Sequence, residues 1–281
     1  MKKIFALGLF IILFAAPVYA FEPSSVLNFD KSAVLDDAGN EWLFNGDPAL
    51  SSTEYISGEY ISGGKSLYLD GNSYIQAKDT EPFNFPGEFT LTAWIYPQKF
   101  VTDHYGGATF TVFSRWLHGI RTLYLVNIEK VDDNNGKLKF YTDFEGIISI
   151  ESKASVPLNK WTHIAITRDA EKIIRLFING KLEDEKRITQ NFTSTDFPMT
   201  IGASSNAMRK SIGYIDDWAV YKTCLYTRDF DVSGRSDKKE NDDEHEKISA
   251  ADEIRKFKGL LDDGIITQEE FNAVKKKLLG L

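Results

Sequence analysis

The chain has 281 residues, a formal net charge of -8 at pH 7 and a single cysteine, Cys224. Phosphates and anionic lipids repel so acidic a chain, which argues against nucleic acid as a partner and against a lysine-rich membrane-binding face. One cysteine excludes a disulfide framework within the chain, and its apolar surroundings predict a packed thiol rather than a reactive one.

Residues 1–20, "MKKIFALGLFIILFAAPVYA", have the features of a secretory signal. Two lysines precede an apolar stretch, and small residues precede Phe21. The stretch is shorter than the roughly 20 residues of a spanning helix, so we expect cleavage before Phe21, with an uncleaved anchor as the alternative. Export to the periplasm or the cell exterior follows, with no stable membrane span left. Cleavage would lower the formal charge by two, from -8 to -10.

Residues 21–230 contain short runs in which apolar and polar residues alternate, with turn signals between them. In "EFTLTAWIYP" the alternation places Phe89, Leu91, Ala93 and Ile95 on one face, and in "GKLKFYTD" it places Leu138 and Phe140 opposite Lys139 and Tyr141. The runs "WTHIAITRD" and "KIIRLFINGK" form a hairpin, and Asn179-Gly180 signals a tight turn. Several runs are apolar on both faces, which is typical of two antiparallel sheets packed face to face. The sequence contains no long amphipathic helix in this block, which argues against an α/β enzyme fold. We therefore predict an all-β sandwich.

Composition changes after residue 230. Residues 231–250 are charged and contain few large apolar side chains, which predicts a flexible linker. In residues 251–281 the periodicity becomes helical, Gly264 can end a first helix, and Thr267 with Glu270 forms a capping box for a second. About thirty residues cannot enclose a stable core alone, so the helical hairpin should meet a second copy or another protein. The apolar stripe predicted to mediate self-association comprises Ile254, Phe257, Leu260, Leu261, Phe271, Val274 and Leu278.

The last segment resembles the short C-terminal domain called SHOCT. The resemblance rests on Leu260, the turn at 264–267, Glu270-Phe271, Lys276 and the ending at 278–280. It implies a small interaction or oligomerisation module without catalysis, and a homo-oligomer is the favoured outcome.

The large block resembles the laminin-G-like group of concanavalin A-like lectin/glucanase domains. "KSLYLDGNSYIQ", "GEFTLTAWIYP", "LNKWTHIAITRD", "RLFINGK", "MTIGA" and "GYIDDWAVYKTCLYTRDF" carry the resemblance through their order and spacing. It implies a jelly-roll sandwich that often serves as a binding module and sometimes holds calcium. Trp94, Trp161 and Trp218 lie in the family-like strands and are assigned to its core.

Two adjacent acids, Asp216 and Asp217, interrupt the last apolar run. Strand residues alternate faces, so Asp216 should share the face of Trp218 and be directed inward. A buried carboxylate needs a cation or several hydrogen-bond donors. The first and last strands of a jelly roll often lie side by side, which makes Asp30 the preferred partner of Asp216 in a structural calcium site. The alternative is that backbone amides of a turn satisfy Asp216 and that Asp217 is solvated.

No motif for catalysis is found. The glucanases of this superfamily typically present Glu-x-Asp-x-x-Glu on one strand, and the sequence has no such string; it also has no Gly-x-Ser-x-Gly elbow. Sugar sites combine aromatic faces with polar side chains, and the segment around "DHYGGATFTVFSRWLHGIR" offers both. The candidate ligand-binding residues are His104, Tyr105, Trp116, His118 and Arg121.

These features together predict an exported, non-catalytic recognition protein. Its sandwich would bind a carbohydrate or a cell-surface protein, and its C-terminal hairpin would gather copies. The alternatives are a glycoside hydrolase of the glucanase-like fold and a purely structural protein-interaction module.

Overall fold

The computed structural model describes residues 22–29, 36–46, 49–52, 65–103, 106–117, 121–204 and 208–232. The predicted signal at 1–20, the linker beyond residue 232 and the predicted hairpin at 251–281 lie outside these ranges, so the predicted domain boundaries stay predictions. Within them, no helix is both long and apolar enough to span a bilayer.

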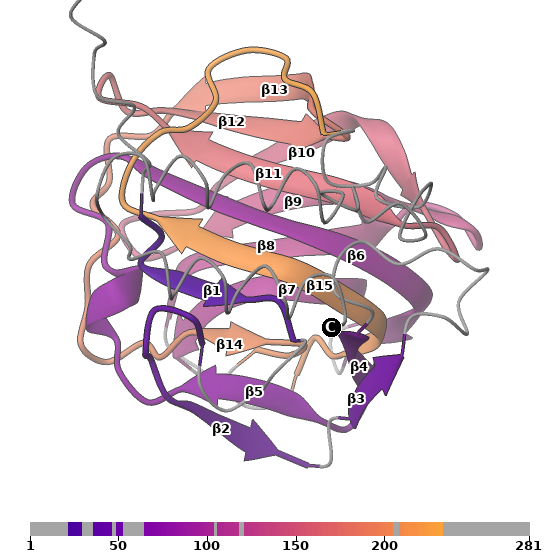
Figure 1. The fold of residues 1–281 in the computed structure, drawn as a ribbon. Helices are drawn as coiled ribbons and strands as arrows, with labels where there is room; N and C mark the ends of the chain where they lie inside the picture. The colour runs from indigo at the N-terminus through magenta and orange to yellow at the C-terminus, as the bar shows by residue number, and fades with distance from the viewer. Residues whose placement is uncertain are drawn as a thin grey trace, which may run out of the picture.

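The described strands pair antiparallel and form two layers, as the alternating runs predicted (Figure 1). The first layer, here called the β6–β15 sheet, runs in the order β3 (Ala49–Ser52), β4 (Lys65–Asp70), β15 (Ser211–Tyr221), β6 (Phe89–Thr102), β11 (Thr162–Arg168), β12 (Ile173–Ile178) and β13 (Lys181–Arg187). β1 (Ser25–Leu27) pairs with the second half of β15.

The second layer is called the β7–β8 sheet. Its order is β10 (Ile148–Pro157), β9 (Asn135–Thr142), β8 (Arg121–Lys130), β7 (Ala108–Leu117), β14 (Thr200–Ile201), β5 (Tyr74–Ala77) and β2 (Trp42–Asn45). A 3-10 turn, η2 (Glu81–Phe83), precedes β6. The layers meet where the end of β6 pairs with the start of β7.

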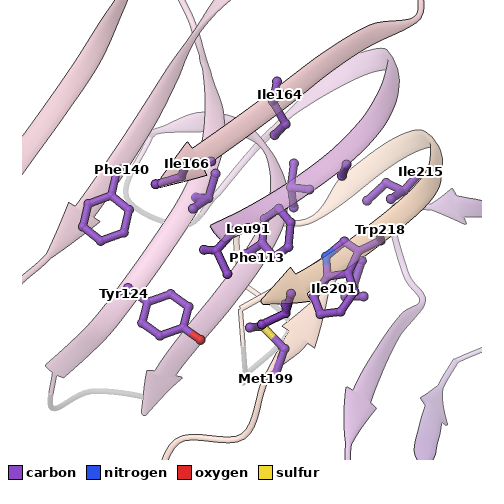
Figure 2. Packing of buried hydrophobic residues seen from close by; sticks show 14 of the residues in the cluster. Leu91, Phe113, Tyr124, Phe140, Ile164, Ile166, Met199, Ile201, Ile215 and Trp218 are labelled. Atoms are coloured by element: carbon purple, nitrogen blue, oxygen red, sulfur yellow. The ribbon is translucent and has the colours of Figure 1, made fainter. Parts of the chain in front are cut away.

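The core lies between the two layers and is rich in aromatic rings (Figure 2). Trp218 is at its centre, stacked on Phe113 with ring centroids 4.9 Å apart and in edge contact with Trp42 at 5.4 Å. Each large apolar side chain buried in this way stabilises the fold by about 1.5–3 kcal/mol. The predicted inward face of β6 is confirmed, because Leu91 and Ile95 are fully buried in this core.

All three tryptophans assigned to the core are buried, but they lie in two separate clusters. Trp94 and Trp161 belong to a separate aromatic cluster, and only Trp218 packs between the sheets. Alternation explains Trp94, because its neighbours Ala93 and Ile95 point into the core and Trp94 therefore points away from it. The sequence could not separate the two faces of β6, since both are apolar and both are buried.

Two buried arginines close one part of the sandwich. Arg115 on β7 donates from Nε to the Phe197 carbonyl at 2.6 Å, from Nη1 to the Phe83 carbonyl at 2.6 Å and from Nη2 to the Ser194 carbonyl at 2.7 Å. Arg168 on β11 similarly donates to carbonyls at positions 87, 188 and 190. Both side chains thus hold loop backbone whose carbonyls would otherwise be buried without donors.

Residues 222–232 form a segment that we call the strap. It follows β15 and runs back over the β6–β15 sheet toward β13 (Figure 1, orange). Thr90 Oγ1 donates to the Thr223 carbonyl at 2.8 Å, and Thr167 Oγ1 donates to the Tyr226 carbonyl at 2.8 Å. Phe230 stacks on Tyr226, with ring centroids 3.6 Å apart. The strap therefore covers part of the outward face of this sheet.

The Asn179-Gly180 turn confirms its sequence signal and anchors the strap. Asn179 and Gly180 have φ values of 48° and 75°, the left-handed pair that a two-residue hairpin turn requires. The Phe230 amide donates to the Gly180 carbonyl at 2.9 Å. A Cβ at position 180 would lie 2.0 Å from the Phe230 carbonyl oxygen, so only glycine fits both the turn and the strap.

Cys224 lies in the strap and is half-buried rather than in the core. Burial raises the pKa of its thiol, so the thiol stays protonated near neutral pH.

Candidate ligand-binding face

The outward face of the β7–β8 sheet carries the polar and aromatic residues of the candidate site. On β9, Leu138 and Phe140 enter the core, so Lys139 and Tyr141 point outward, as the alternation predicted. Tyr141 pairs with Leu125 on β8, which in turn pairs with Ser114 on β7. These cross-strand neighbours place the three strands' outward side chains on one continuous surface.

Trp116 is half-buried at the end of β7 and is the central aromatic ring of this face. The guanidinium carbon of Arg209 lies 5.8 Å from its ring centroid, within the range of a cation–π contact. Arg209 Nε is 3.8 Å from Asp103 Oδ2, and the Asp103 side chain is fully buried. The arginine is thus held between a carboxylate and an indole ring while 27% of its side chain stays exposed.

The backbone at Arg209 has φ of 50°, a left-handed value that is unusual for a residue other than glycine. Its carbonyl accepts a hydrogen bond from Thr111 Oγ1 at 2.5 Å, which ties this turn to β7. Such conformations cost roughly 1–3 kcal/mol and persist where surrounding contacts fix them, often at functional sites.

Tyr141 and Asp143 form a second polar element. The Tyr141 hydroxyl donates to Asp143 Oδ2 at 3.2 Å, and the Thr122 amide donates to Asp143 Oδ1. Burial raises the pKa of Tyr141, the Asp143 carboxylate raises it further, and the nearby Arg209 charge partly opposes both. Tyr141 is therefore a neutral hydrogen-bonding phenol, and its interaction with Arg209 shows that the two belong to one electrostatic environment.

Two buried polar atoms lie on the same side of the sheet. Ser114 Oγ and Asn127 Oδ1 have no hydrogen-bond partner in the described part of the chain, and both residues are at most 2% exposed. An unpaired buried polar atom costs about 1–3 kcal/mol, and an ordered water or a ligand hydroxyl is the kind of group that satisfies it. Both atoms are closed to solvent, so they lie beneath this face and not on its surface.

The structure describes the positions of two of the five predicted ligand-binding residues. Trp116 and Arg121 lie at the same end of the β7–β8 hairpin, where Leu117 pairs with Arg121. Arg121 is exposed, and its Nη1 donates to the Phe144 carbonyl. The other three predicted residues, His104, Tyr105 and His118, lie outside the described residues.

Three residues of this face were not predicted as ligand-binding: Tyr141, Asp143 and Arg209. Alternation in "GKLKFYTD" indicated the direction of Tyr141, and extending it by two residues would have added Asp143. No sequence pattern marks Arg209, because its position depends on a turn that reaches β7 from residues about 100 positions away.

The paired acids lie on a β-bulge of β15. Asp217 has φ of 44°, and the pairing with β6 shifts register directly after Asp216. The bulge lets Ile215 and Trp218, three residues apart, both enter the core, whereas Asp216 pairs with Trp94 and lies on the opposite face. The predicted burial of Asp216 is confirmed at 0% exposure, but the predicted face shared with Trp218 is wrong.

The expected adjacency of the first and last strands is confirmed, since Leu27 pairs with Trp218. Asp30 itself lies outside the described residues, so its pairing with Asp216 stays a prediction. Among the residues that are described, no group of three or more His, Cys, Asp or Glu side chains could hold a metal. The nearby Asp36 instead accepts hydrogen bonds from the Ala38 and Asn40 amides at 3.0 and 2.8 Å, as in a turn.

Comparison with known proteins agrees with this architecture. Residues 69–229 match the concanavalin A-like lectin/glucanases superfamily, and residues 252–279 match the short C-terminal domain family, SHOCT. No curated protein sequence matches the chain.

Among solved structures, the chain is similar to domain 4 of AbnA, an extracellular arabinanase from Geobacillus stearothermophilus in complex with arabinotriose. The identity is 18% and the TM-score 0.55, covering 73% of this chain and 95% of that domain. The binding domains of Paraclostridial Mosquitocidal Protein 1 and of botulinum neurotoxin serotype G match at 18% and 16% identity, with TM-scores of 0.54 and 0.52. Each comparison covers 73% of this chain but only 49% of the toxin chain.

At these identities the structural likeness shows the fold alone. The family match spans more than half of the 281 residues, and it agrees with the antiparallel two-layer architecture described above. The chain belongs to the concanavalin A-like lectin/glucanases superfamily and carries a SHOCT segment near its C-terminus.

Proposed function

We propose that this protein is an exported recognition protein whose sandwich binds a carbohydrate through the outward face of the β7–β8 sheet. The observation that carries the proposal is the half-exposed Trp116 ring beside Arg209 and the Tyr141–Asp143 pair. An aromatic ring packs against the apolar face of a sugar, while the charged groups and the phenol bind its hydroxyls.

The structural neighbours support binding over turnover. One is a domain in complex with arabinotriose, and two others are called binding domains. On this chain, both carboxylate oxygens of Asp143 already accept hydrogen bonds, which suits a fixed ligand contact better than a free catalytic group.

We further propose that residues 251–281 gather copies of the protein. A weak single-site lectin gains avidity when several sites engage one surface, because later contacts form at high effective concentration. The match of residues 252–279 to SHOCT supports a separate module here. Sedimentation of the mature chain with and without residues 251–281 tests this role, and equal particle mass in both would contradict it.

A glycan array followed by calorimetry tests the sugar site. We expect Trp116→Ala to weaken binding of the selected glycan by about 10–100-fold, the range for loss of one aromatic contact in a binding site. Val131→Ala is the control, since that apolar side chain is 60% exposed and follows β8 at the end opposite Arg121. Unchanged affinity in a folded Trp116→Ala variant would show that this face does not bind the glycan. An array without hits, combined with a stable protein partner, would favour the alternative of a structural protein-interaction module.

Glycoside hydrolysis is the second candidate, because the concanavalin A-like superfamily includes glucanases. The test is release of reducing ends from a panel of polysaccharides by the wild-type chain and by Asp143→Asn. Turnover in the wild type that disappears in the variant would replace binding by catalysis.

A further inference from the structure

We infer that the glycan bound by the β7–β8 face carries a carboxylate and that Arg209 binds this group. The inference rests on the proposed function, because it names the class of sugar for the same face. It makes Arg209 the residue that determines specificity, whereas the Trp116 ring serves any sugar with an apolar face.

Arg209 has hydrogen-bond donors that the protein does not use. A guanidinium group carries five N–H donors. Among the described residues no nitrogen of this side chain makes a hydrogen bond, since the 3.8 Å between Nε and Asp103 Oδ2 is too long for one. The buried Arg115 and Arg168 differ, because each donates to three backbone carbonyls. With 27% of its side chain exposed, Arg209 offers its donors to a ligand.

The Arg209 side chain is nevertheless held in place before a ligand arrives. The Trp116 ring centroid lies 5.8 Å from the guanidinium carbon, and the Asp103 carboxylate lies near Nε. The backbone is fixed as well, because Thr111 Oγ1 donates to the Arg209 carbonyl at 2.5 Å. Immobilising a flexible side chain on binding costs about 0.5–1.5 kcal/mol. These contacts reduce that cost at Arg209.

A turn fixes the Asp103 carboxylate that lies beside Arg209. Asp103 Oδ1 accepts a hydrogen bond from the Gly107 amide at 2.9 Å, and the Asp103 amide donates to the Gly107 carbonyl at 2.7 Å. A Cβ at position 107 would lie 3.3 Å from Asp103 Oδ2, so the glycine leaves room for the carboxylate. Because Asp103 lies nearest to Nε, the two terminal nitrogens of the guanidinium stay available for a carboxylate of the ligand.

The neighbouring groups match the remaining parts of a sugar acid. The Tyr141 hydroxyl donates to Asp143 Oδ2, so its oxygen is left to accept a hydrogen bond from a sugar hydroxyl. The Trp116 ring can pack on the apolar face of the sugar. Hydroxyls and an apolar face are common to all sugars, but the flat donor pair of an arginine best fits a carboxylate, which accepts two parallel hydrogen bonds. A sugar acid uses all three elements.

Negative charges of the protein oppose the binding of an acid, and they act mainly at a distance. The formal net charge is -8, but salt screens exposed charges beyond about 8 Å at physiological ionic strength. The local carboxylate of Asp143 is already hydrogen-bonded by the Thr122 amide and the Tyr141 hydroxyl. Selection of the acid therefore depends on direct contact with Arg209 and not on the overall field of the protein.

The test uses the full mature chain on a glycan array in which each acidic glycan stands beside its methyl ester. Oligogalacturonate, oligoglucuronate and sialyllactose serve as the acids, together with neutral and sulfated glycans. The ester keeps the sugar and removes the charge. We expect the wild-type chain to bind at least one acid about 10–100-fold more tightly than its ester, the range for hydrogen bonds to a charged group. This comparison needs no substitution, so it does not depend on the folding of a variant.

Arg209→Gln should lower the affinity for the acid to that for the ester and leave the affinity for the ester unchanged. Arg209→Lys keeps the charge without the flat donor pair and should retain part of the preference. Arg187→Gln is the matched control, because it removes the same charge from an exposed position on β13, in the other layer, and should leave both affinities unchanged. Melting curves check that each variant is folded.

The inference would be overturned by equal binding of acid and ester to the wild-type chain, or by a preference for the acid that survives in folded Arg209→Gln. A sulfated glycan bound more tightly than every carboxylate would also contradict it. Binding of a neutral glycan that is lost in Trp116→Ala but kept in Arg209→Gln would contradict the inference and leave the proposed function intact. Binding of no glycan at all would contradict both.

Discussion

The two outward faces of the sandwich differ in the kinds of interaction that their side chains make. The β7–β8 face presents a half-exposed indole, a guanidinium, a phenol paired with a carboxylate, and two buried polar atoms. The β6–β15 face carries contiguous aromatic rings and is partly covered by the strap. The first face is suited to reversible binding of a polar ligand, and the second to a stable apolar contact such as the one made by the strap.

The difference shows that the two outward faces of one sandwich can make different kinds of contact. Because strands alternate, each sheet contributes half of its residues to a shared core, and the other halves are free to differ.

The largest expected effect comes from removing the buried Arg115 side chain, which holds loop backbone through hydrogen bonds to its carbonyls. Arg115→Ala would leave the Phe197 and Ser194 carbonyls without their Arg115 donor and the Phe83 carbonyl with the Tyr124 hydroxyl alone, and we expect the free energy of unfolding to fall by about 3 kcal/mol or more. Urea denaturation measures the change. Arg121→Ala is the control, since that exposed side chain donates to a single carbonyl and should cost no more than about 0.5 kcal/mol. Equal losses in the two variants would contradict the role of Arg115.

Gly180→Ala should weaken the contact between the strap and the Asn179-Gly180 turn and leave the β7–β8 face unchanged. The new Cβ would clash with the Phe230 carbonyl in addition to the strain of a positive φ, and we expect a loss of roughly 2 kcal/mol with glycan affinity retained. Gly39→Ala shares the positive φ but meets nothing within 4 Å. The difference between the two variants in thermal unfolding isolates the strap contact, and no difference would show that the strap yields freely.

If Asp216 and Asp30 hold a calcium ion, the metal is a further difference between the β6–β15 sheet and the β7–β8 sheet. A ligand that binds only the folded chain stabilises it by about 1.4 kcal/mol at ten times its dissociation constant. We expect the melting temperature to rise with calcium relative to chelator in the wild type and not in Asp216→Asn. Identical melting with calcium and with chelator at saturating concentrations would eliminate the site.

The smallest expected effect is a change in stability that is confined to acidic pH. Burial alone would raise the pKa of Asp169, but the Ile173 amide and the Arg175 guanidinium, 2.6 Å away, outweigh it and hold the pKa below its usual range. The resulting stabilisation is present above the unfolded pKa of about 3.9 and is lost as pH falls through the lower folded value. In Asp169→Asn the free energy of unfolding should therefore fall less steeply as the pH is lowered into the acidic range; we call this part of the curve the acid limb. Asp133→Asn, at a 93% exposed side chain, should leave that limb unchanged; an equal flattening there would contradict the assignment.

Much of the architecture followed from local pattern. Alternation in the runs around Phe89 and Leu138 predicted which side chains enter the core, and Asn179-Gly180 predicted its turn, because backbone sterics act over a few residues. The same logic failed at Asp216, where a bulge reversed the face after one residue. Alternation also could not say which cluster Trp94 would join, because both faces of β6 are apolar and buried.

The sequence by itself determined the strands, the acidic charge, the two family resemblances and the outward direction of Tyr141. Only the tertiary structure brought Arg209 to Trp116, gathered Tyr68, Tyr96 and Tyr214 into one surface, and laid the strap against Gly180. These contacts join residues far apart along the chain. Their formation depends on strand order and register, which are set by cooperative packing of the whole core and not by any single segment.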